Sequence, residues 1–177
     1  MAEGSEIGML AQILVLVLIP GLFVAAACWD VASFTIPNSV SLGLLAAFAI
    51  AALACHMTPE VFGSHLLAGF IGLVAGFTLF ALGYVGGGDA KLFACTALAF
   101  GLHDLLDYTV VASVFGGALT LSLLAARKIP LPRTLAAQGW ILRLHDEREG
   151  IPYGVALALG ALVLLPHTEF FRLATGG

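Results

Sequence analysis

The sequence predicts an all-α polytopic membrane protein with six transmembrane helices, formed by a single membrane-embedded domain over residues 1–177. Hydrophobic residues make up 60% of the chain and charged residues 10%, against about 45–50% and about 25% in soluble domains. The mean hydropathy is +1.06. The apolar residues also gather into six runs, and a chain of 177 residues holds about six spans of ~20 residues without room for a separate soluble domain.

The first three runs cover residues 7–27, 40–55 and 66–85. The first contains Pro20-Gly21, which a membrane helix tolerates as a kink, and Trp29 follows it at the expected membrane interface. No Lys or Arg precedes this run. Because a secretory signal peptide begins with a basic segment, we expect this run to be retained as a span.

The last three runs cover residues 92–102, 105–126 and 153–165. The fourth is about half the length needed to cross ~30 Å of hydrocarbon, so it must include the preceding glycine segment or be a short helix surrounded by protein. Residues 127–152 form the one long polar stretch. Its mixture of Leu, Ile and Trp with charges of both signs suits a short helix on the membrane surface, and a solvated connector explains it equally well.

The basic residues predict the orientation of these spans. All but Arg172 fall on the face reached after spans one, three and five, namely Lys91, Arg127, Lys128, Arg133, Arg143 and Arg148. By the positive-inside rule this face is cytoplasmic, and both termini are outside. The net charge of −4 comes with no basic run, so nucleic acid is excluded as a partner.

Two isolated acids indicate a functional site. Asp30 ends the first apolar run, and Asp89 directly follows three glycines. An ionisable side chain at membrane depth costs roughly 2.5–3.5 kcal/mol, which makes a functional role the default interpretation. Because Asp30 follows span one and Asp89 follows span three, the chain crosses the membrane twice between them and returns to the same face. The two carboxyl groups could therefore meet.

A pair of carboxyl groups within hydrogen-bond reach titrates as a unit. One group can act as a base while the other is an acid, so that the pair activates a water for attack on a peptide carbonyl and protonates the leaving amine. This chemistry uses no metal and no covalent intermediate. The glycines before Asp89 would let the backbone approach a substrate closely and turn sharply.

Each feature also has a structural explanation. Asp89 could be the N-cap of span four, where hydrogen bonding and the helix dipole favour Asp. Asp30 is harder to explain in this way, since a carboxylate at the C-terminal end of a helix opposes the dipole. The alternative that Asp30 is a plain surface acid in a loop remains. Asn38 or Ser39 could cap span two after a turn at Pro37.

Other polar residues are expected to lie outside this site. Asp104 and Asp107 fall at the opposite face and are interpreted as interface acids. Cys28, Cys55 and Cys95 form no C-x-x-C pair and are interpreted as small buried hydrophobes. No metal and no cofactor is expected, because the histidines lack an H-E-x-x-H spacing and the glycines lack the phosphate-loop pattern.

Three motifs together resemble the type IV prepilin peptidases, which are bacterial inner-membrane members of the GxGD aspartic proteases. The motifs are Asp30 followed by Ile36-Pro37-Asn38, then Gly86-Gly87-Gly88-Asp89 with Lys91, and Ile151-Pro152-Tyr153-Gly154 opening the last span. The resemblance extends over nearly the whole chain. It implies that Asp30 and Asp89 are catalytic and that the partner is the short basic leader of a pilin precursor, cut on the cytoplasmic side after a glycine.

Further residues of these motifs are candidates for supporting or substrate-binding roles: Pro37, Asn38, Gly86, Gly87, Gly88, Lys91, Pro152 and Tyr153. Among them Lys91 lies two residues from Asp89, about 200° round a helix. We therefore expect Lys91 to point away from the acid and to anchor span four.

The chain resembles one branch of that family more than the others. Larger relatives carry an extra cytoplasmic segment with paired C-x-x-C motifs and also methylate the new pilin N-terminus. This sequence has no such motifs, so it resembles the short form associated with tight-adherence (Flp-type) pili, with peptidase activity only. Presenilin-like proteases match less well, because Ile151-Pro152-Tyr153 stands where their Pro-Ala-Leu motif is expected. The archaeal preflagellin peptidases are the closest rival.

A proton-coupled membrane transporter subunit is the alternative from another functional class, since intramembrane carboxylates and glycine-interrupted spans also serve transport. Against it, the two halves show no internal repeat and both acids belong to one face. A purely structural assembly subunit would leave Asp30 without a reason. The sequence does not specify the precursor, the residues that recognise its cleavage site, or the oligomeric state.

Overall fold

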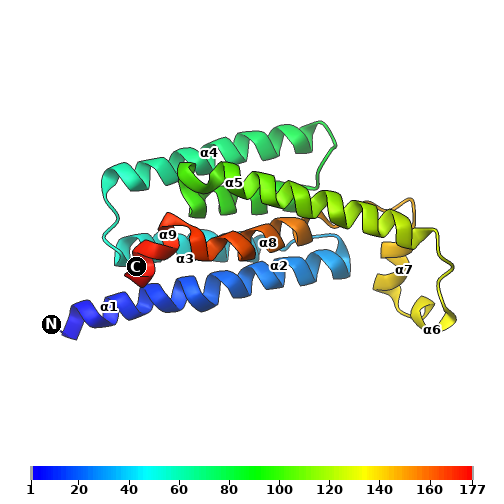
Figure 1. Cartoon of the computed structure of the whole chain (residues 1–177), viewed down its shortest axis with the longest axis horizontal. Helices are drawn as coiled ribbons and strands as arrows, with labels where there is room; N and C mark the ends of the chain where they lie inside the picture. The colour runs from blue at the N-terminus through cyan, green and yellow to red at the C-terminus, as the bar shows by residue number, and fades with distance from the viewer. Residues whose placement is uncertain (1, 177) are drawn as a thin grey trace.

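The computed structural model describes residues 2–176, and this part of the chain is all-helical, without a strand. The side chain of Arg133, one of the basic residues used for the orientation, lies outside the described part. The helices run along a common long direction, and α1 begins at the same end of the bundle at which α9 ends (Figure 1). The predicted class of all-α membrane protein is confirmed.

The first span is one continuous helical stretch formed by α1 (Ala2–Ile13), a π-helical segment (Leu14–Leu18) and α2 (Ile19–Ser33). Proline has no N–H and its ring collides with the carbonyl four residues earlier. The wider π turns directly precede Pro20 and accommodate it, so the helix continues through Pro20 instead of ending there. Asp30 is consequently inside α2 and not beyond it.

The buried residues of this span form a single stripe. Among the described side chains they are Ala11, Leu14, Val15, Ile19, Phe23, Ala26 and Asp30. The spacings of three and four residues place them on one face of the helix. Asp30 therefore points into the bundle along with the core.

Two shorter connections lead to the next helices. Phe34 ends α2 in a left-handed conformation with φ of 54°, and α3 (Asn38–Ala54) begins after the extended Pro37. Thr58 caps α4 (Pro59–Ala81), because its hydroxyl accepts a hydrogen bond from the Val61 N–H at 3.4 Å. Helix α4 thus begins and ends earlier in the sequence than the predicted run of 66–85.

Helix α5 (Gly87–Arg127) folds back on itself at Gly101, which has a non-helical φ of 76° and ψ of 175°. The rings of Phe93 and Tyr108 stack with centroids 5.7 Å apart, whereas an uninterrupted helix would separate these positions by about 22 Å. Residues 87–101 and 102–127 therefore lie antiparallel (Figure 1). The reversal falls at the end of the fourth predicted run, just before the fifth.

His65 of α4 packs against this reversal. A Cβ atom on Gly101 would lie 2.9 Å from His65 Nε2, so both the backbone conformation and the close approach require glycine. The imidazole is buried and its Nδ1 lies 2.8 Å from the Leu98 carbonyl oxygen. The fold of α5 thus depends on a contact with α4.

The rest of the chain contains α6 (Arg133–Ala136), α7 (Gly139–His145), α8 (Tyr153–Leu164), a 3₁₀ turn (Leu165–His167) and α9 (Glu169–Thr175). The chain bends by 53° between the 3₁₀ turn and α9. Figure 1 places α6 and α7 beyond one end of the bundle, next to the end of α5. A short helix is therefore present in the linker, as one of the two interpretations predicted.

By length and apolar composition, three helices of the described chain can cross a membrane, namely Gly8–Ser33, Pro59–Ala81 and Gly87–Arg127. The bent pair formed by α8 and α9 raises this number to four, and α3 is apolar but shorter. The predicted number of six spans is therefore not confirmed, since two of the predicted runs belong to the single element α5 and α3 is shorter than these helices.

Small residues bring α4 into close contact with the first half of α5. A Cβ on Gly72 would lie 2.6 Å from the Ala97 Cβ, and one on Gly76 would lie 2.9 Å from the Ala90 carbonyl oxygen. Glycines at such positions let two membrane helices approach closely. Helix α4 therefore fixes the position of the residues that follow Asp89.

The cysteines only partly follow the prediction of small buried hydrophobes. Cys95 is buried and Cys55 is half-buried, whereas Cys28 is exposed. The prediction is wrong for Cys28, because the apolar surroundings of a membrane helix include the lipid as well as the protein core.

Candidate active site

The Asp30 carboxyl lies at the N-terminus of α8. Its side chain is buried, with the residue 3% exposed, and the backbone amides of Gly154 and Val155 face it. Both amides belong to the first turn of α8, where N–H groups lack helical partners and the helix dipole favours a negative charge. The start of α8 thus compensates for a position at the end of α2 that the dipole of α2 disfavours.

Asp30 is nevertheless not fully satisfied. Within residues 2–176, its Oδ2 is buried and has no hydrogen-bond partner. A Cβ on Gly154 would lie only 2.8 Å from this oxygen. An unpaired carboxylate oxygen in a buried position is energetically costly, and it is available to a substrate or a water.

Asp89 is the third residue of α5, and its half-buried side chain turns back towards the helix start. Its Oδ2 accepts a hydrogen bond from the Gly86 N–H at 3.2 Å. The expectation that Asp89 is the N-cap is wrong, because Gly86 holds that position. Asp89 still satisfies one free N–H of the helix terminus, from the third position as in a capping box.

The two carboxyl groups meet at Gly154. Asp89 also faces the Gly154 N–H, and the charges of Asp30 and Asp89 act on each other. Three helices that are distant in sequence, α2, α5 and α8, therefore converge on one backbone amide. The two acids come together as the number of crossings between them predicted.

The Ile36-Pro37 loop closes the site from a fourth direction. A Cβ on Gly88 would lie 3.1 Å from the Ile36 backbone nitrogen, and one on Gly154 would lie 2.7 Å from Ile36 Cδ1. Neither glycine can carry a side chain without moving Ile36. The two glycines thus allow the protein's own loop to approach closely, and the predicted approach of a substrate stays a prediction.

The predicted sharp turn lies elsewhere. Gly83 has the positive φ of 77°, whereas Gly86 is extended with φ of −71° and ψ of 152°. Gly87 packs against Phe80, whose Cε2 would lie 3.3 Å from an added Cβ. The glycines before Asp89 therefore serve packing, and the turn precedes them.

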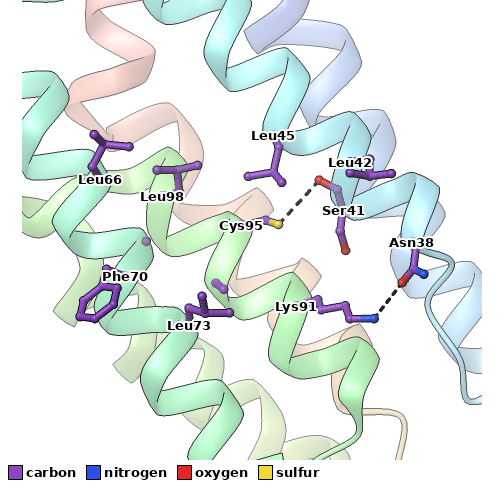
Figure 2. Close-up of a pocket in the computed structure, with 12 residues that line it drawn as sticks. Asn38, Ser41, Leu42, Leu45, Leu66, Phe70, Leu73, Lys91, Cys95 and Leu98 are labelled. Atoms are coloured by element: carbon purple, nitrogen blue, oxygen red, sulfur yellow. Dashed lines mark hydrogen bonds between the residues drawn. The ribbon is translucent and has the colours of Figure 1, made fainter.

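Asn38 and Lys91 connect α3 to α5. The Lys91 ammonium donates a hydrogen bond to Asn38 Oδ1 at 2.8 Å (Figure 2). The expectation that Asn38 caps α3 is wrong, because Pro37 is the cap residue and no side chain caps this helix. Lys91 is exposed and reaches towards α3, in agreement with the prediction that it anchors the start of α5.

This pair marks one end of an open apolar groove of about 520 Å³ between α3, α4 and α5. Figure 2 shows leucine and phenylalanine side chains lining the groove away from Asn38 and Lys91. Near the middle, the Cys95 thiol donates to the Ser41 carbonyl oxygen at 3.6 Å. The groove therefore has one polar end, which lies next to the residues that follow Asp89.

Pro152 and Tyr153 form the start of α8. Pro152 is fully buried and precedes the helix as its cap residue. The Tyr153 hydroxyl lies 3.4 Å from Thr120 Oγ1, and its ring covers Gly116, where an added Cβ would lie 3.1 Å from Cε1. Tyr153 and Asp89 both line a second cavity of about 320 Å³ between α4, α5 and α8.

The linker docks on the helix that carries Asp30. Arg127 donates to the carbonyl oxygens of Leu144 at 2.9 Å, Glu149 at 3.2 Å and Gly150 at 2.9 Å. Arg143 of α7 donates to the Ala32 carbonyl oxygen near the end of α2. These contacts hold α7 beside the site.

Asp104 and Asp107 lie away from the site, as predicted. Asp104 is buried, with its Oδ1 2.9 Å from His103 Nδ1 and its Oδ2 accepting the Glu169 N–H at 2.9 Å. Asp104 thus attaches the start of α9 to α5, and its position at the membrane interface stays a prediction. Asp107 is exposed.

Two residues of the site are missing from the candidates that the sequence provided. Gly154 and Ile36 both touch the carboxyl pair or its glycines, although each belongs to a motif that carries the resemblance. Their positions next to Tyr153 and Pro37 in these motifs could have indicated a role in the site. Their contacts depend on how three helices pack against one another, which the sequence does not show.

Two carboxyl groups that share a backbone donor are suited to acid–base chemistry on a bound water or carbonyl. Among residues 2–176, no group of three or more His, Cys, Asp or Glu side chains is arranged to hold a metal ion. The arrangement of the two carboxyl groups suits proton transfer to and from a bound substrate.

The sequence is similar to one family of known proteins. The sequence model described as the Type IV leader peptidase family matches residues 16–121, which include both aspartates. A curated relative, the prepilin leader peptidase/N-methyltransferase of Bacillus subtilis (strain 168), is 29% identical over 170 residues, which cover 90% of this chain and 66% of the relative. No solved structure matches. Since the family match extends over more than half of the sequence, the chain belongs to the type IV leader peptidase family.

Proposed function

We propose that this protein is an intramembrane aspartic endopeptidase that removes the leader peptide of type IV prepilins of the Flp type. Asp30 and Asp89 form the catalytic pair, without a cofactor. The observation that carries the proposal is the convergence of both carboxyl groups on the Gly154 amide. The family match and the printed name of the Bacillus subtilis relative support the substrate class.

In the proposed reaction a water binds between the two carboxyl groups. The ionised group takes a proton from the water as it attacks the scissile carbonyl, and the protonated group supplies a proton to the reacting peptide. The C–N bond then breaks as the acid formed in the first step protonates the leaving amine, and a hydroxyl of the tetrahedral intermediate returns a proton to the other carboxylate. The unpaired Oδ2 of Asp30 is free to contact this water.

We further propose six membrane crossings. The reversal at Gly101 supports two crossings by α5, and α1 with α2, α3, α4, and α8 with α9 supply the other four. An even number agrees with the position of both chain ends at one end of the bundle (Figure 1). All basic residues except Arg172 then belong to the end that carries the aspartates, which supports a site facing the cytoplasm of a bacterial inner membrane.

The catalytic pair is tested by replacing each acid separately. Asp30→Asn and Asp89→Asn keep the size of the side chain but cannot exchange a proton, so each is expected to lower the rate of precursor cleavage by at least about 10³-fold. The double variant should be no worse than either single variant, because the two residues act as a unit. The measurement is cleavage of an Flp-type precursor by the full chain in detergent, followed on gels.

Asp107→Asn is the matched control, since Asp107 is an exposed acid outside the site. It should cleave at the wild-type rate, and all variants should insert into the membrane. Wild-type cleavage by either Asp30→Asn or Asp89→Asn would overturn the proposal and favour the transporter interpretation.

A further inference from the structure

The second cavity, of about 320 Å³, is directly connected to the carboxyl pair. Asp89 forms part of its wall, and Tyr153 lies beside Gly154, whose N–H faces both acids. The remaining lining includes Leu79 of α4, Phe93 of α5 and Leu157 of α8. The cavity is therefore an apolar space that opens at the proposed site of proton transfer.

The hydroxyl groups in the cavity wall are already used within their own helix. Thr109 donates to the Leu105 carbonyl oxygen at 2.8 Å, and Ser113 donates to the Thr109 carbonyl oxygen at 2.7 Å. The other polar side chains of the described lining are Asp89, which accepts the Gly86 N–H, and Tyr153, whose hydroxyl lies 3.4 Å from Thr120 Oγ1. A polar occupant would lose its hydration without replacement partners, whereas an apolar occupant gains from burial.

The size of the cavity limits the occupant. Pockets for small molecules measure about 300–1,000 Å³, and this cavity is at the lower end of that range. It accommodates one or two side chains and not a folded segment. Successive residues of an extended peptide are at most about 3.6 Å apart, so a peptide bond held at Asp89 places a neighbouring side chain at the cavity.

We propose that this cavity binds one bulky apolar side chain of the peptide substrate, within three residues of the scissile bond, and so selects the substrate. The proposal rests on the peptidase function proposed above. Because cleavage then depends on burying that side chain, its replacement by Ala is expected to lower kcat/KM by about 10- to 100-fold.

The test uses precursor variants with Ala, Leu, Phe or Trp at each of the three positions on either side of the cut. The wild-type protein should prefer a bulky apolar residue at one of these positions. Ser113→Phe fills the cavity from α5. This variant should reduce the preference for a bulky apolar residue over Ala to within about threefold.

Two further variants make the result specific. Ser122→Phe carries the same change at an exposed position of the same helix outside the cavity, and it should keep the wild-type preference. Leu79→Ala enlarges the cavity and should shift the preference towards Trp. If Ser113→Phe proves inactive on every precursor, the shift in Leu79→Ala decides the question.

The outcomes separate the two proposals. A wild-type protein that cleaves no precursor overturns the peptidase function itself. A wild-type protein that cleaves but has no side-chain preference, or whose preference is unchanged in Ser113→Phe and Leu79→Ala, overturns only the pocket. Cleavage without a side-chain preference is the result expected if a lipid chain occupies the cavity.

Discussion

A carboxyl group buried within a membrane bundle needs compensation, and Asp30 obtains part of it from two backbone amides at the start of α8. Isolated ionised groups are far too costly to bury. Gly154 makes this arrangement possible, because its missing side chain lets the Asp30 carboxyl approach the helix terminus. At the scale of a single residue, the site therefore depends on a glycine as much as on the two acids.

Gly154→Ala is expected to damage the site. The new Cβ would lie 2.8 Å from Asp30 Oδ2 and 2.7 Å from Ile36 Cδ1, so one of them must move. Displacement of a catalytic group by about 1 Å can cost about 10²-fold in rate. The measurements are precursor cleavage and thermal unfolding. Gly117→Ala, where an added Cβ meets nothing within 4 Å, should retain full activity, and equal rates for the two variants would contradict this account.

Some of these residue contacts were predictable and others were not. The meeting of Asp30 and Asp89 follows from counting crossings, which does not require exact helix ends. The Asn38–Lys91 hydrogen bond and the role of Gly154 depend on how α3, α5 and α8 pack. Small residues at helix contacts look like any other glycine or alanine in an apolar sequence, so the packing could not be predicted from hydropathy.

At the scale of elements, the reversal of α5 decides where the site lies. It brings residues 89–93 beside residues 109–113, and both segments line the apolar cavity next to Asp89. The sequence predicts the fourth and fifth apolar runs as separate spans, but it does not predict the backbone conformation that connects them. The structure locates it at one residue, Gly101, because a backbone with φ of 76° and ψ of 175° is essentially restricted to glycine.

Gly101→Ala is therefore expected to destabilise the fold. The unfavourable backbone conformation alone costs about 1–3 kcal/mol, and the contact of the new Cβ with His65 Nε2 at 2.9 Å adds to this cost. His65→Ala should restore part of the loss in Gly101→Ala, since the two positions are in contact. The free energy of unfolding in detergent checks this.

Gly63→Ala, on open surface of α4, is the control and should be as stable as the wild type or slightly more stable. If Gly101→Ala were as stable as Gly63→Ala, the reversal would not depend on glycine, and another connection between the two halves of α5 would have to be considered.

At the scale of the whole molecule, the bundle places the site and the linker at one end and the start of α1 and the end of α9 at the other (Figure 1). Single cysteines introduced in a cysteine-free background test this arrangement in cells. Labels at Asn38 and Arg143 should report the same, cytoplasmic face, and a label at Pro59 the opposite face. Asn38 and Arg143 on different faces would exclude a shared cytoplasmic site.

The unequal lengths of the helices have a consequence for the lipid around the protein. The first half of α5 measures about 22 Å and α3 about 26 Å, while α4 measures about 35 Å and the second half of α5 about 39 Å. The two helices that begin nearest the aspartates are thus shorter than the ~30 Å hydrocarbon layer. We expect a bilayer beside these short helices to thin locally and to bring headgroups and water closer to the carboxyl pair. For the proposed peptidase, local thinning would supply a hydrolytic water at membrane depth without a continuous channel through the protein.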